Sequence, residues 1–343
     1  MNGASGLQLE RLDLDGVDWP RLDAFPDRQI FETREWLAFL DETQRGEAVV
    51  CALSDGSEQL GFFTGYLVRR YGIRILGSPM PGWTTGYMGF DLEPGVSRAA
   101  AAEALVRYAR EELGCAQIEL RDRELPLQRL GQFNVDPFKT FEIDLTRRED
   151  EIFNAMTSAC RRAVRKGQKE GVVVEQASDI EFADDYYAQL VDVFAKQSLR
   201  PTYDLERVRA LVRHLQPSGR LLLVRARNPE GKCIATGIFP ALGRSMYFWG
   251  GASWREDQIL RPNEAVFWFA IRYWKERGIE VFDMGGGGEY KRKYGGEELE
   301  VPHFSWSRFR ALKTMRGVVR QLRSPSGLKS RLTKKVHRVP TRR

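Results

Sequence analysis

The segment from residue 281 to residue 296 holds the side chains of this chain that are best suited to chemistry. A short apolar run ends in Asp283, four glycines follow at 285–288, and Tyr290 and Lys291 come within three further positions. Glycine has no Cβ atom, so a run of glycines lets a ligand or another backbone approach closely. The spacing therefore predicts a ligand site with Lys291 as a fixed positive charge beside it.

The residues needed for several common kinds of catalysis are missing. The chain has three histidines, at 214, 303 and 337, and no Gly-x-Ser-x-Gly motif, so a serine triad is not expected. No cluster of His, Cys, Asp or Glu has metal-ligand spacing, and no metal site is expected. A Walker loop is absent, and the glycine run lacks the helix of a dinucleotide fingerprint. Acyl transfer to an amine remains, because binding, orientation and oxyanion stabilisation can drive it without a covalent nucleophile.

Two basic segments are suited to an anionic ligand. Arg261 lies just ahead of the free N–H groups of a predicted helix, where a phosphate of coenzyme A or of a nucleotide would fit, although the same residues also make an ordinary helix start. Upstream, two cationic ridges on a predicted helix, Arg161 with Arg165 and Arg162 with Lys166, have no acid between them. Either an anionic ligand or acidic residues from elsewhere in the fold must balance these ridges.

The composition is typical of a soluble globular protein with two cores. The chain has 343 residues, of which 42% are hydrophobic and 29% charged. Its four cysteines show no Cys-x-x-Cys spacing, which favours free thiols in a reducing compartment. No apolar run approaches the roughly 20 residues needed to span a bilayer, and no leader pattern is present. We therefore expect a cytoplasmic protein, with the inner face of the cytoplasmic membrane as an alternative location.

The net charge of +6 arises at the C-terminal end of the chain. Residues 313–343 carry 11 Lys or Arg and no Asp or Glu, whereas the remaining chain has 42 basic and 47 acidic residues. Apolar residues recur at helical spacing among the first of these charges. The segment is therefore either a basic amphipathic helix for an anionic membrane or a nucleic acid, or a final packed helix followed by a solvated tail.

The order of the predicted elements indicates an α+β fold with α/β layering. In the first half we expect a helix starting near Thr33, an aromatic loop at 77–95, a helix at 98–113, and strands at 7–12, 48–53, 60–76, 117–120 and 138–145. In the second half we expect a loop at 251–261, helices at 149–167, 181–196, 204–215 and 263–277, and strands at 172–175, 220–227, 232–239, 245–250 and 280–283.

This order suggests domains at 1–147 and 148–312, followed by the basic tail at 313–343. The succession of strand, glycine-rich or aromatic loop, helix, glycine and strand occurs twice, at 73–120 and at 246–283. We interpret this as a tandem repeat of one fold.

Several short motifs occur in order through most of residues 31–300. They are Thr33-x-x-Trp36, Arg161-Arg162-x-x-Arg165-Lys166, the run from Tyr247 to Ser253, Pro262-Asn263 at a helix start, Phe282-Asp283-x-Gly285, and Tyr290-Lys291-x-x-Tyr294-Gly295. In this order they resemble the FemABX family, which comprises GNAT-fold transferases that form peptidoglycan bridges and is closely related to GNAT-like acyltransferases of polysaccharide biosynthesis.

The resemblance implies an acyltransferase or aminoacyltransferase with tandem GNAT-like domains, each a mixed, mostly antiparallel sheet flanked by helices. An amine of a nucleotide- or lipid-linked cell-envelope precursor would attack an activated acyl group carried by acyl-CoA or by aminoacyl-tRNA. The sequence has no long helical hairpin like that of the longest family members, which leaves tRNA as an open partner. The basic tail would suit tRNA or an anionic membrane surface equally.

Individual residues carry over only where the motifs match. Lys291 corresponds to the family lysine beside the reacting groups, where it would stabilise an oxyanion or hold a phosphate. Tyr290 is a further candidate catalytic residue, and Asp283 and Glu289 are candidate bases by proximity alone. The candidate substrate-binding residues are Arg161, Arg165, Trp249, Gly250, Arg261, Asn263, Gly285, Gly286 and Tyr294.

Two other functions remain open at this point. One is an acetyl-CoA-dependent N-acetyltransferase that acts on an amino sugar of an exported polysaccharide. The other is a non-catalytic RNA- or membrane-binding protein with the same fold. Saturable binding of an acyl donor separates both enzymes from the binding protein.

Overall fold

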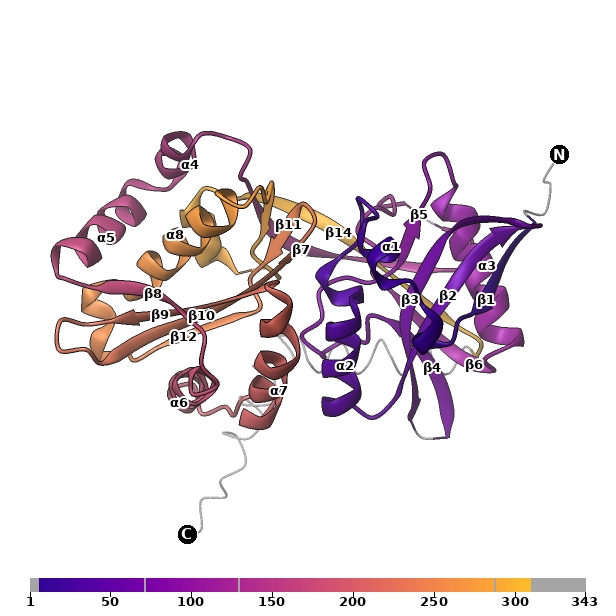
Figure 1. Cartoon of the computed structure of the whole chain (residues 1–343), viewed down its shortest axis with the longest axis horizontal. Coiled ribbons are helices and arrows are strands. Elements are labelled where there is room, and N and C mark those ends of the chain that lie inside the picture. The colour runs from indigo at the N-terminus through magenta and orange to yellow at the C-terminus, as the bar shows by residue number, and fades with distance from the viewer. Residues whose placement is uncertain (1–5, 71, 129, 287, 310–343) are drawn as a thin grey trace, which may run out of the picture.

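The computed structural model of the chain describes residues 6–70, 72–128, 130–286 and 288–309, in two lobes that follow the order of the sequence (Figure 1). Its strands join in one hydrogen-bonded path in the order β1-β2-β3-β4-β6-β14-β7-β13-β11-β10-β9-β8, with β5 beside β3 and β12 beside β10. No helix among these residues is long and apolar enough to cross a lipid bilayer. The predicted basic tail and its amphipathic helix lie outside the described residues.

The N-terminal lobe is a mostly antiparallel sheet with helices against it. Thr33 starts α2 as predicted, because its Oγ1 accepts a hydrogen bond from the Trp36 N–H at 3.3 Å. Ser97 starts the alanine-rich helix α3 in the same way. The elements are β1 (Leu7–Arg11), η1 (Leu14–Gly16), α1 (Trp19–Asp23), η2 (Ile30–Glu32), α2 (Arg34–Thr43), β2 (Glu47–Asp55), β3 (Glu58–Arg70), β4 (Ile73–Ser78), β5 (Phe90–Leu92), α3 (Arg98–Glu111), β6 (Cys115–Leu120) and β7 (Asn134–Asp144).

The C-terminal lobe repeats this plan, with strands that continue the same hydrogen-bonded path and with its own helices. Asp204 caps α7 as its position in the sequence suggests, accepting from the Arg207 N–H at 3.0 Å. The elements are α4 (Glu149–Ala155), α5 (Ser158–Lys169), β8 (Val173–Ala177), α6 (Phe182–Ala195), α7 (Leu205–Leu215), η3 (Gln216–Ser218), β9 (Leu221–Arg227), β10 (Cys233–Leu242), β11 (Ser245–Tyr247), β12 (Gly250–Ser253), η4 (Glu256–Leu260), α8 (Pro262–Lys275), β13 (Val281–Asp283), η5 (Glu289–Tyr294) and β14 (Glu297–Ser307).

The two lobes contain the same connection. In each, a helix joins two strands that pair in parallel: α3 joins β4 to β6, and α8 joins β11 to β13. In each, the short strand before the helix pairs antiparallel with an earlier strand, β5 with β3 and β12 with β10. The repeat expected at 73–120 and 246–283 therefore corresponds to one topology that occurs twice.

Two long strands connect the lobes. Figure 1 shows β7 and β14 running together from one lobe to the other, and they pair antiparallel from Glu142↔Glu297 to Asn134↔Ser305. The far end of β14 also pairs with β6, with Phe304 opposite Leu120. The predicted domain boundary at 147/148 falls between β7 and α4, but β14, from beyond that boundary, completes the sheet of the first lobe.

The lobes also share buried apolar side chains. One core cluster contains Trp36 and Phe39 of α2 together with Val208 and Leu211 of α7. At the rim of this contact, Glu42 pairs with Arg213 and with His214. The position of each lobe is therefore fixed by side chains of the other.

Several predicted elements need correction. The strand expected at 245–250 ends at Tyr247, and the loop expected at 251–261 contains most of β12 and all of η4. The helix expected at 149–167 is two helices, because Met156 has an extended backbone and the Thr157 Oγ1 accepts from the Cys160 N–H at 3.3 Å, which starts a new helix. The aromatic loop expected at 77–95 contains the strand β5, which pairs with residues 61–63 of β3. Strand β14 has no counterpart among the predicted elements.

Candidate functional site

The segment between β13 and η5 forms a tight turn, which we call the glycine turn and define as residues 284–286. Gly285 and Gly286 have φ of +65° and +57°, a backbone region that favours glycine. A Cβ atom on Gly285 would lie 2.7 Å from the Tyr247 Oη. The close approach expected of this glycine run is thus an approach to a neighbouring tyrosine. Residue 287 lies outside the described residues.

Lys291 is held against the glycine turn. Its ammonium donates to the carbonyl oxygens of Met284 at 2.6 Å and Gly286 at 3.1 Å, and the residue is 6% exposed. Burial lowers the pKa of Lys291 to about 8, an effect that the negative charge of Asp283 partly opposes. The ring centroids of Phe248 and Tyr290 each lie 5.8 Å from the Nζ atom. Lys291 therefore exchanges its proton much closer to neutral pH than an exposed lysine does.

Asp283 ends β13 and is fully surrounded by donors. Its Oδ2 accepts from the Tyr87 hydroxyl at 2.5 Å and from Arg123 Nη1 at 3.1 Å. Its Oδ1 accepts from the Thr140 hydroxyl and from the Gly285 N–H, both at 2.7 Å. These four donors occupy the roughly four lone-pair sites of a carboxylate. The contacts of Asp283 are thus those of a group that positions its neighbours, and the structure gives no open lone pair for the role of base.

The other predicted residues of η5 lie on different sides of the helix. Tyr290 is 55% exposed, whereas Tyr294 is buried and its ring stacks on Phe267 of α8 with centroids 4.5 Å apart. Glu289 is exposed and pairs with Arg292 at 3.3 Å. Among these three, Tyr290 is the one that presents its ring to solvent beside Lys291.

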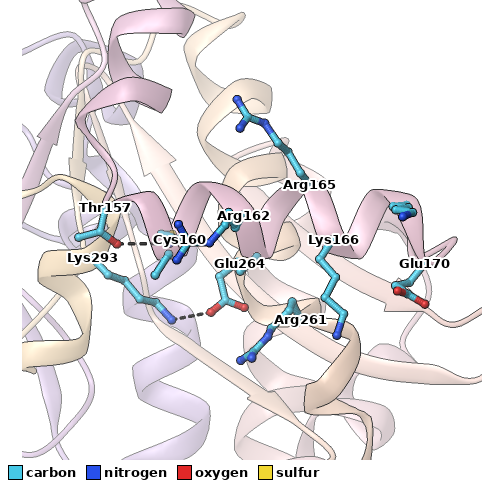
Figure 2. Close-up of a pocket in the computed structure, with 12 residues that line it drawn as sticks. Thr157, Cys160, Arg162, Arg165, Lys166, Glu170, Arg261, Glu264 and Lys293 are labelled. Atoms are coloured by element: carbon cyan, nitrogen blue, oxygen red, sulfur yellow. Dashed lines mark hydrogen bonds and ion pairs between the residues drawn. The ribbon is translucent and has the colours of Figure 1, made fainter.

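A second feature is a pocket of about 740 Å³ between α5 and the start of α8, which we call the α5–α8 pocket. Six basic and two acidic side chains line it, together with four uncharged residues. Figure 2 shows Lys166 and Arg261 reaching into the same space, with Lys293 entering from η5. The lining residues are Thr157, Ala159, Cys160, Arg162, Ala163, Arg165, Lys166, Lys169, Glu170, Arg261, Glu264 and Lys293.

The backbone supports this pocket as an anion site. Arg261 immediately precedes α8 with a left-handed φ of 60°, and the first N–H groups of an α-helix have no partner within the helix. Helix α5 packs closely on this loop at Gly167, where a Cβ atom would lie 3.2 Å from the Leu260 carbonyl oxygen. Positive side chains and a helix start therefore meet at one place, an arrangement that suits an anion.

The pocket and the glycine turn are joined by η5. Lys293 of η5 pairs with Glu264 in the first turn of α8 at 2.7 Å (Figure 2). Lys291, two residues earlier on the same short helix, contacts the glycine turn. An anion in the pocket would compete with Glu264 for Lys293. A ligand held there would thus lie next to the segment that carries Lys291.

The structure brings some of the predicted binding residues together and separates others. Arg165 and Arg261 line the α5–α8 pocket, although the Arg165 guanidinium lies over the Phe153 ring at 5.3 Å and points away from Lys166 in Figure 2. Arg161 does not line the pocket. It donates instead to the carbonyls of Asn154 and Met156 at the end of α4.

Three further predicted residues support the site from inside the fold. Asn263 donates to the Ser253 hydroxyl at 3.0 Å and so ties the start of α8 to β12. Trp249 is buried against Tyr186, and a Cβ atom on Gly250 would lie 2.3 Å from the Tyr186 hydroxyl. These positions are internal packing positions rather than surfaces of the pocket.

Several pocket residues are absent from the predicted set. The charged ones are Arg162, Lys166, Lys169, Glu170, Glu264 and Lys293. The sequence does show the ridge of Arg162 and Lys166, but which ridge of α5 faces the pocket depends on its packing against α8. Lys293 carries no local signal that separates it from its basic neighbours.

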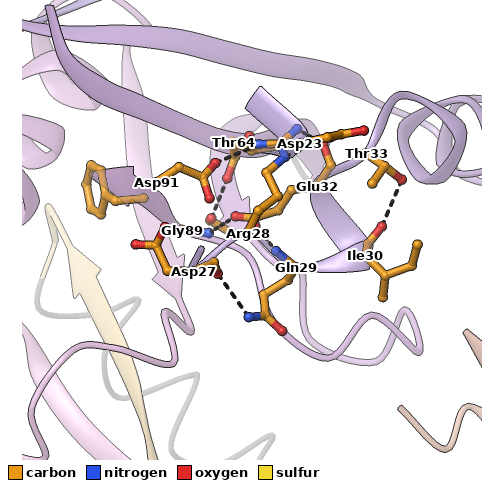
Figure 3. Close-up of polar contacts among 12 residues, drawn as sticks. Asp23, Asp27, Arg28, Gln29, Ile30, Glu32, Thr33, Thr64, Gly89 and Asp91 are labelled. Carbon is orange, nitrogen blue, oxygen red and sulfur yellow. Dashed lines mark hydrogen bonds and ion pairs between the residues drawn. The ribbon is translucent and has the colours of Figure 1, made fainter. Parts of the chain in front are cut away.

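The equivalent helix start in the N-terminal lobe is closed by charge pairing. Arg98, the first residue of α3, pairs with Asp27 and with Asp122. Beside it, Arg28 is buried and donates to Asp91 at 2.6 Å and to Asp23 at 3.2 Å (Figure 3). These cations already have carboxylate partners inside the protein. The basic pocket at the start of α8 thus has no counterpart at the start of α3.

Residues 155–293 match the family described as an acetyltransferase (GNAT) domain. This range includes α5, α8, the glycine turn and Lys291. No curated protein matches the chain in sequence.

Solved structures match over nearly the whole chain. A crystal structure of FemX has 15% identity and a TM-score of 0.72, covering 89% of this chain and 99% of its own. A tandem GNAT protein from the clavulanic acid biosynthesis pathway has 12% identity and a TM-score of 0.53, with coverages of 88% and 99%. L-PGS from Bacillus licheniformis has 14% identity and a TM-score of 0.52, with coverages of 83% and 95%. At these identities the likeness concerns the fold, and the predicted tandem GNAT-like fold is confirmed.

Proposed function

We propose that the protein transfers an activated acyl group to an amine of a cell-envelope precursor, because residues 155–293 match an acetyltransferase (GNAT) domain and the chain has the fold of FemX. The observation that carries the proposal is the basic α5–α8 pocket beside Lys291. Acyl-CoA and aminoacyl-tRNA both carry phosphates that such a pocket would bind. Both therefore remain candidate donors.

The geometry suggests how the reaction proceeds. The donor phosphates bind Lys166, Arg261 and Lys293, which places the acyl carbonyl near the glycine turn. The amine attacks this carbonyl, and the Lys291 ammonium stabilises the oxyanion that forms. When the intermediate collapses, the C–S bond of acyl-CoA or the ester C–O bond of aminoacyl-tRNA breaks, and the thiolate or ribose oxygen that leaves takes up the proton released by the attacking amine. Tyr290 forms the solvent-facing wall beside Lys291 and is the candidate for contact with the acceptor.

The acceptor side is proposed from the fold that the chain shares with FemX and with L-PGS. A nucleotide- or lipid-linked precursor would be met in the cytoplasm or at the inner face of the cytoplasmic membrane. Residues 313–343, with 11 basic and no acidic side chains, would hold the enzyme at an anionic surface or contact tRNA.

An acetyl-CoA-dependent amino-sugar N-acetyltransferase is the second candidate. It is favoured by the volume of the pocket, about 740 Å³, which is within the range of small-molecule sites. A donor of nucleotide size fits such a volume without any extended RNA-binding surface.

The identity of the acyl donor distinguishes these two functions. Purified protein is incubated with labelled acetyl-CoA or with charged tRNA, and with a nucleotide-linked muropeptide or a nucleotide-linked amino sugar. Label on the muropeptide amine from charged tRNA alone supports aminoacyl transfer, and label from acetyl-CoA without tRNA supports acetyl transfer. If neither donor binds saturably, the protein is a binding protein that has lost the chemistry.

The pocket is tested by charge removal at α8. Arg261→Ala and Lys166→Ala should each weaken donor binding by about tenfold or more, since one charge-assisted hydrogen bond contributes about 1.5–3 kcal/mol. Arg277→Ala is the matched control, because this exposed arginine lies just beyond the opposite end of α8. Equal effects at Arg261 and Arg277 would remove the α5–α8 pocket from donor binding.

A further inference from the structure

The site in the C-terminal lobe is completed by residues of the N-terminal lobe. Arg123 lies three residues beyond β6, and Tyr87 lies in the segment between β4 and β5. Both donate to the same Asp283 oxygen. In the C-terminal lobe the equivalent segment, between β11 and β12, has only residues 248 and 249. The longer segment of the N-terminal lobe therefore reaches across to the partner lobe.

Asp283 connects Arg123 and Tyr87 to Lys291 through the glycine turn. Its other oxygen accepts from the Gly285 N–H at 2.7 Å, and this bond fixes the left-handed residue at the centre of the glycine turn. The carbonyls on either side of Gly285 are the two acceptors of the Lys291 ammonium. A continuous chain of hydrogen bonds thus runs from Arg123 and Tyr87 through the glycine turn to Lys291.

The positive and negative charges along this series of hydrogen bonds are nearly balanced. Arg123 bonds Glu142 of β7 as well as Asp283, and its guanidinium lies 5.4 Å from the Tyr87 ring centroid. Burial raises the pKa of Glu142, and Arg123 opposes that shift. The charged group that acts on Lys291 is Asp283, and the neighbouring tyrosines are Tyr87, Tyr247 and Tyr290. Arg123 is the cation that bonds Asp283 directly, and Arg121 is a further, partly buried cation close enough for its charge to interact with Asp283.

We propose that Arg123 and Tyr87 of the N-terminal lobe are positioning residues that hold the Asp283 turn against Lys291 and balance its charge. This inference rests on the proposed function, in which Lys291 acts on the reacting carbonyl. It assigns the N-terminal lobe a direct part in preparing the site of the C-terminal lobe. Replacing Arg123 and replacing Asp283 are expected to shift the pKa of Lys291 in opposite directions.

Removing Arg123 leaves the negative charge of Asp283 less balanced, which favours protonated Lys291 and raises its pKa. Removing the charge of Asp283 has the opposite effect. Shifts of about one pH unit are expected for close, buried charges. A residue that only stabilises the fold would not produce two shifts of opposite sign.

The test measures Lys291 directly. The rate at which acetic anhydride labels Lys291 is followed by mass spectrometry as a function of pH, with the midpoint near pH 8 in the wild type. Arg123→Gln should move the midpoint up and Asp283→Asn should move it down. Arg98→Gln, which breaks a buried arginine–carboxylate pair within the N-terminal lobe, should leave it unchanged. An Arg123→Gln midpoint equal to or below that of the wild type overturns the proposal.

A second variant covers the case in which Arg123→Gln does not fold. Glu142→Gln leaves Arg123 to balance Asp283 alone, so the midpoint should fall, and an unchanged midpoint would contradict the inference. The labelling needs neither donor nor acceptor. If the labelling midpoints do not shift, the proposed acyl transfer is unaffected. If instead Lys291→Ala keeps full turnover, Lys291 has no role in acyl transfer, even where the Arg123, Asp283 and Glu142 variants shift the labelling midpoint.

Discussion

Lys291 combines burial with carbonyl groups as its hydrogen-bond partners. Its pKa, lowered to about 8 by burial, means that the ammonium is present at neutral pH and is lost as the pH rises through 8. If the protonated form stabilises the oxyanion, turnover must follow the protonated fraction. The pH profile at Lys291 therefore reports its role more specifically than activity at one pH.

We expect Lys291→Ala to lower turnover by more than tenfold at pH 7 with little change in the unfolding temperature. In the wild type, kcat should fall above pH 8, and Lys291→Arg should lack this alkaline limb because a guanidinium stays charged. Initial rates between pH 6 and pH 10 measure both effects. Lys139→Ala, at an exposed lysine of β7, is the control, and unchanged turnover in Lys291→Ala would exclude the lysine from the reaction.

Part of the site can be predicted from single residues and part cannot. Gly285, Lys291 and Arg261 are accessible to sequence reasoning because each depends on a short local pattern. The partners of Asp283 are not, since Tyr87 and Arg123 lie 196 and 160 residues away in the chain. Only the packing of the two lobes brings these side chains together, so the positioning role of Asp283 could not be read from its neighbours in sequence.

At the scale of elements, the glycine turn has two successive residues in the left-handed backbone conformation. Gly285 and Gly286 share the left-handed conformation, but only Gly285 has a neighbour that a Cβ atom would strike, the Tyr247 hydroxyl at 2.7 Å. The two positions therefore form a matched pair. They separate the cost of backbone strain from the cost of a steric clash.

We expect Gly286→Ala to destabilise the protein by about 1–2 kcal/mol from strain alone. Gly285→Ala should cost more and should also lower turnover, because it displaces Tyr247 or the carbonyls that hold Lys291. Urea unfolding and steady-state kinetics measure the two quantities. Equal stability and equal turnover in the two variants would show that the contact with Tyr247 does not constrain the turn.

Helices and strands are predictable here to the extent that their signals are local. Helix α7 follows Asp204, and α2 follows Thr33, because a cap is a contact within four residues. Strand β14 could not be predicted because it is formed by pairing with β6 and β7, whose residues are more than 150 positions away in the sequence. The packing of α5 against a distant helix likewise decides which of its residues face the pocket, so the sequence could not show that Lys166 lines the pocket and Arg161 does not.

At the scale of the whole molecule, the basic tail adds a charge that the folded lobes lack. Deleting residues 324–343 should leave turnover on soluble substrates intact and weaken binding to anionic vesicles, because six or more cations near a surface contribute about 1 kcal/mol each. Co-sedimentation with phosphatidylserine vesicles and with neutral vesicles measures this binding. Identical vesicle binding with and without the segment would exclude a membrane role for it.

The two lobes are expected to fold as one unit because β14 lies inside the sheet of the first lobe. It pairs with both β6 and β7, and it contributes Phe304, Val301 and Trp306, each buried, to the described cores. Burying three such side chains contributes about 5–9 kcal/mol, which is comparable to the whole stability of a typical domain. The first lobe without this strand would have little stability left.

We therefore expect a chain of residues 1–309 to unfold in a single transition at the wild-type temperature, and a chain of residues 1–296 to be insoluble or unfolded. Circular dichroism during thermal unfolding and gel filtration distinguish these outcomes. The chain of residues 1–309 is the control for loss of the tail alone. A soluble 1–296 chain with two separate transitions would mean that the lobes are independent. In that case the contact between Arg123 and Asp283 would join two domains that are stable on their own, rather than two parts of one cooperative unit.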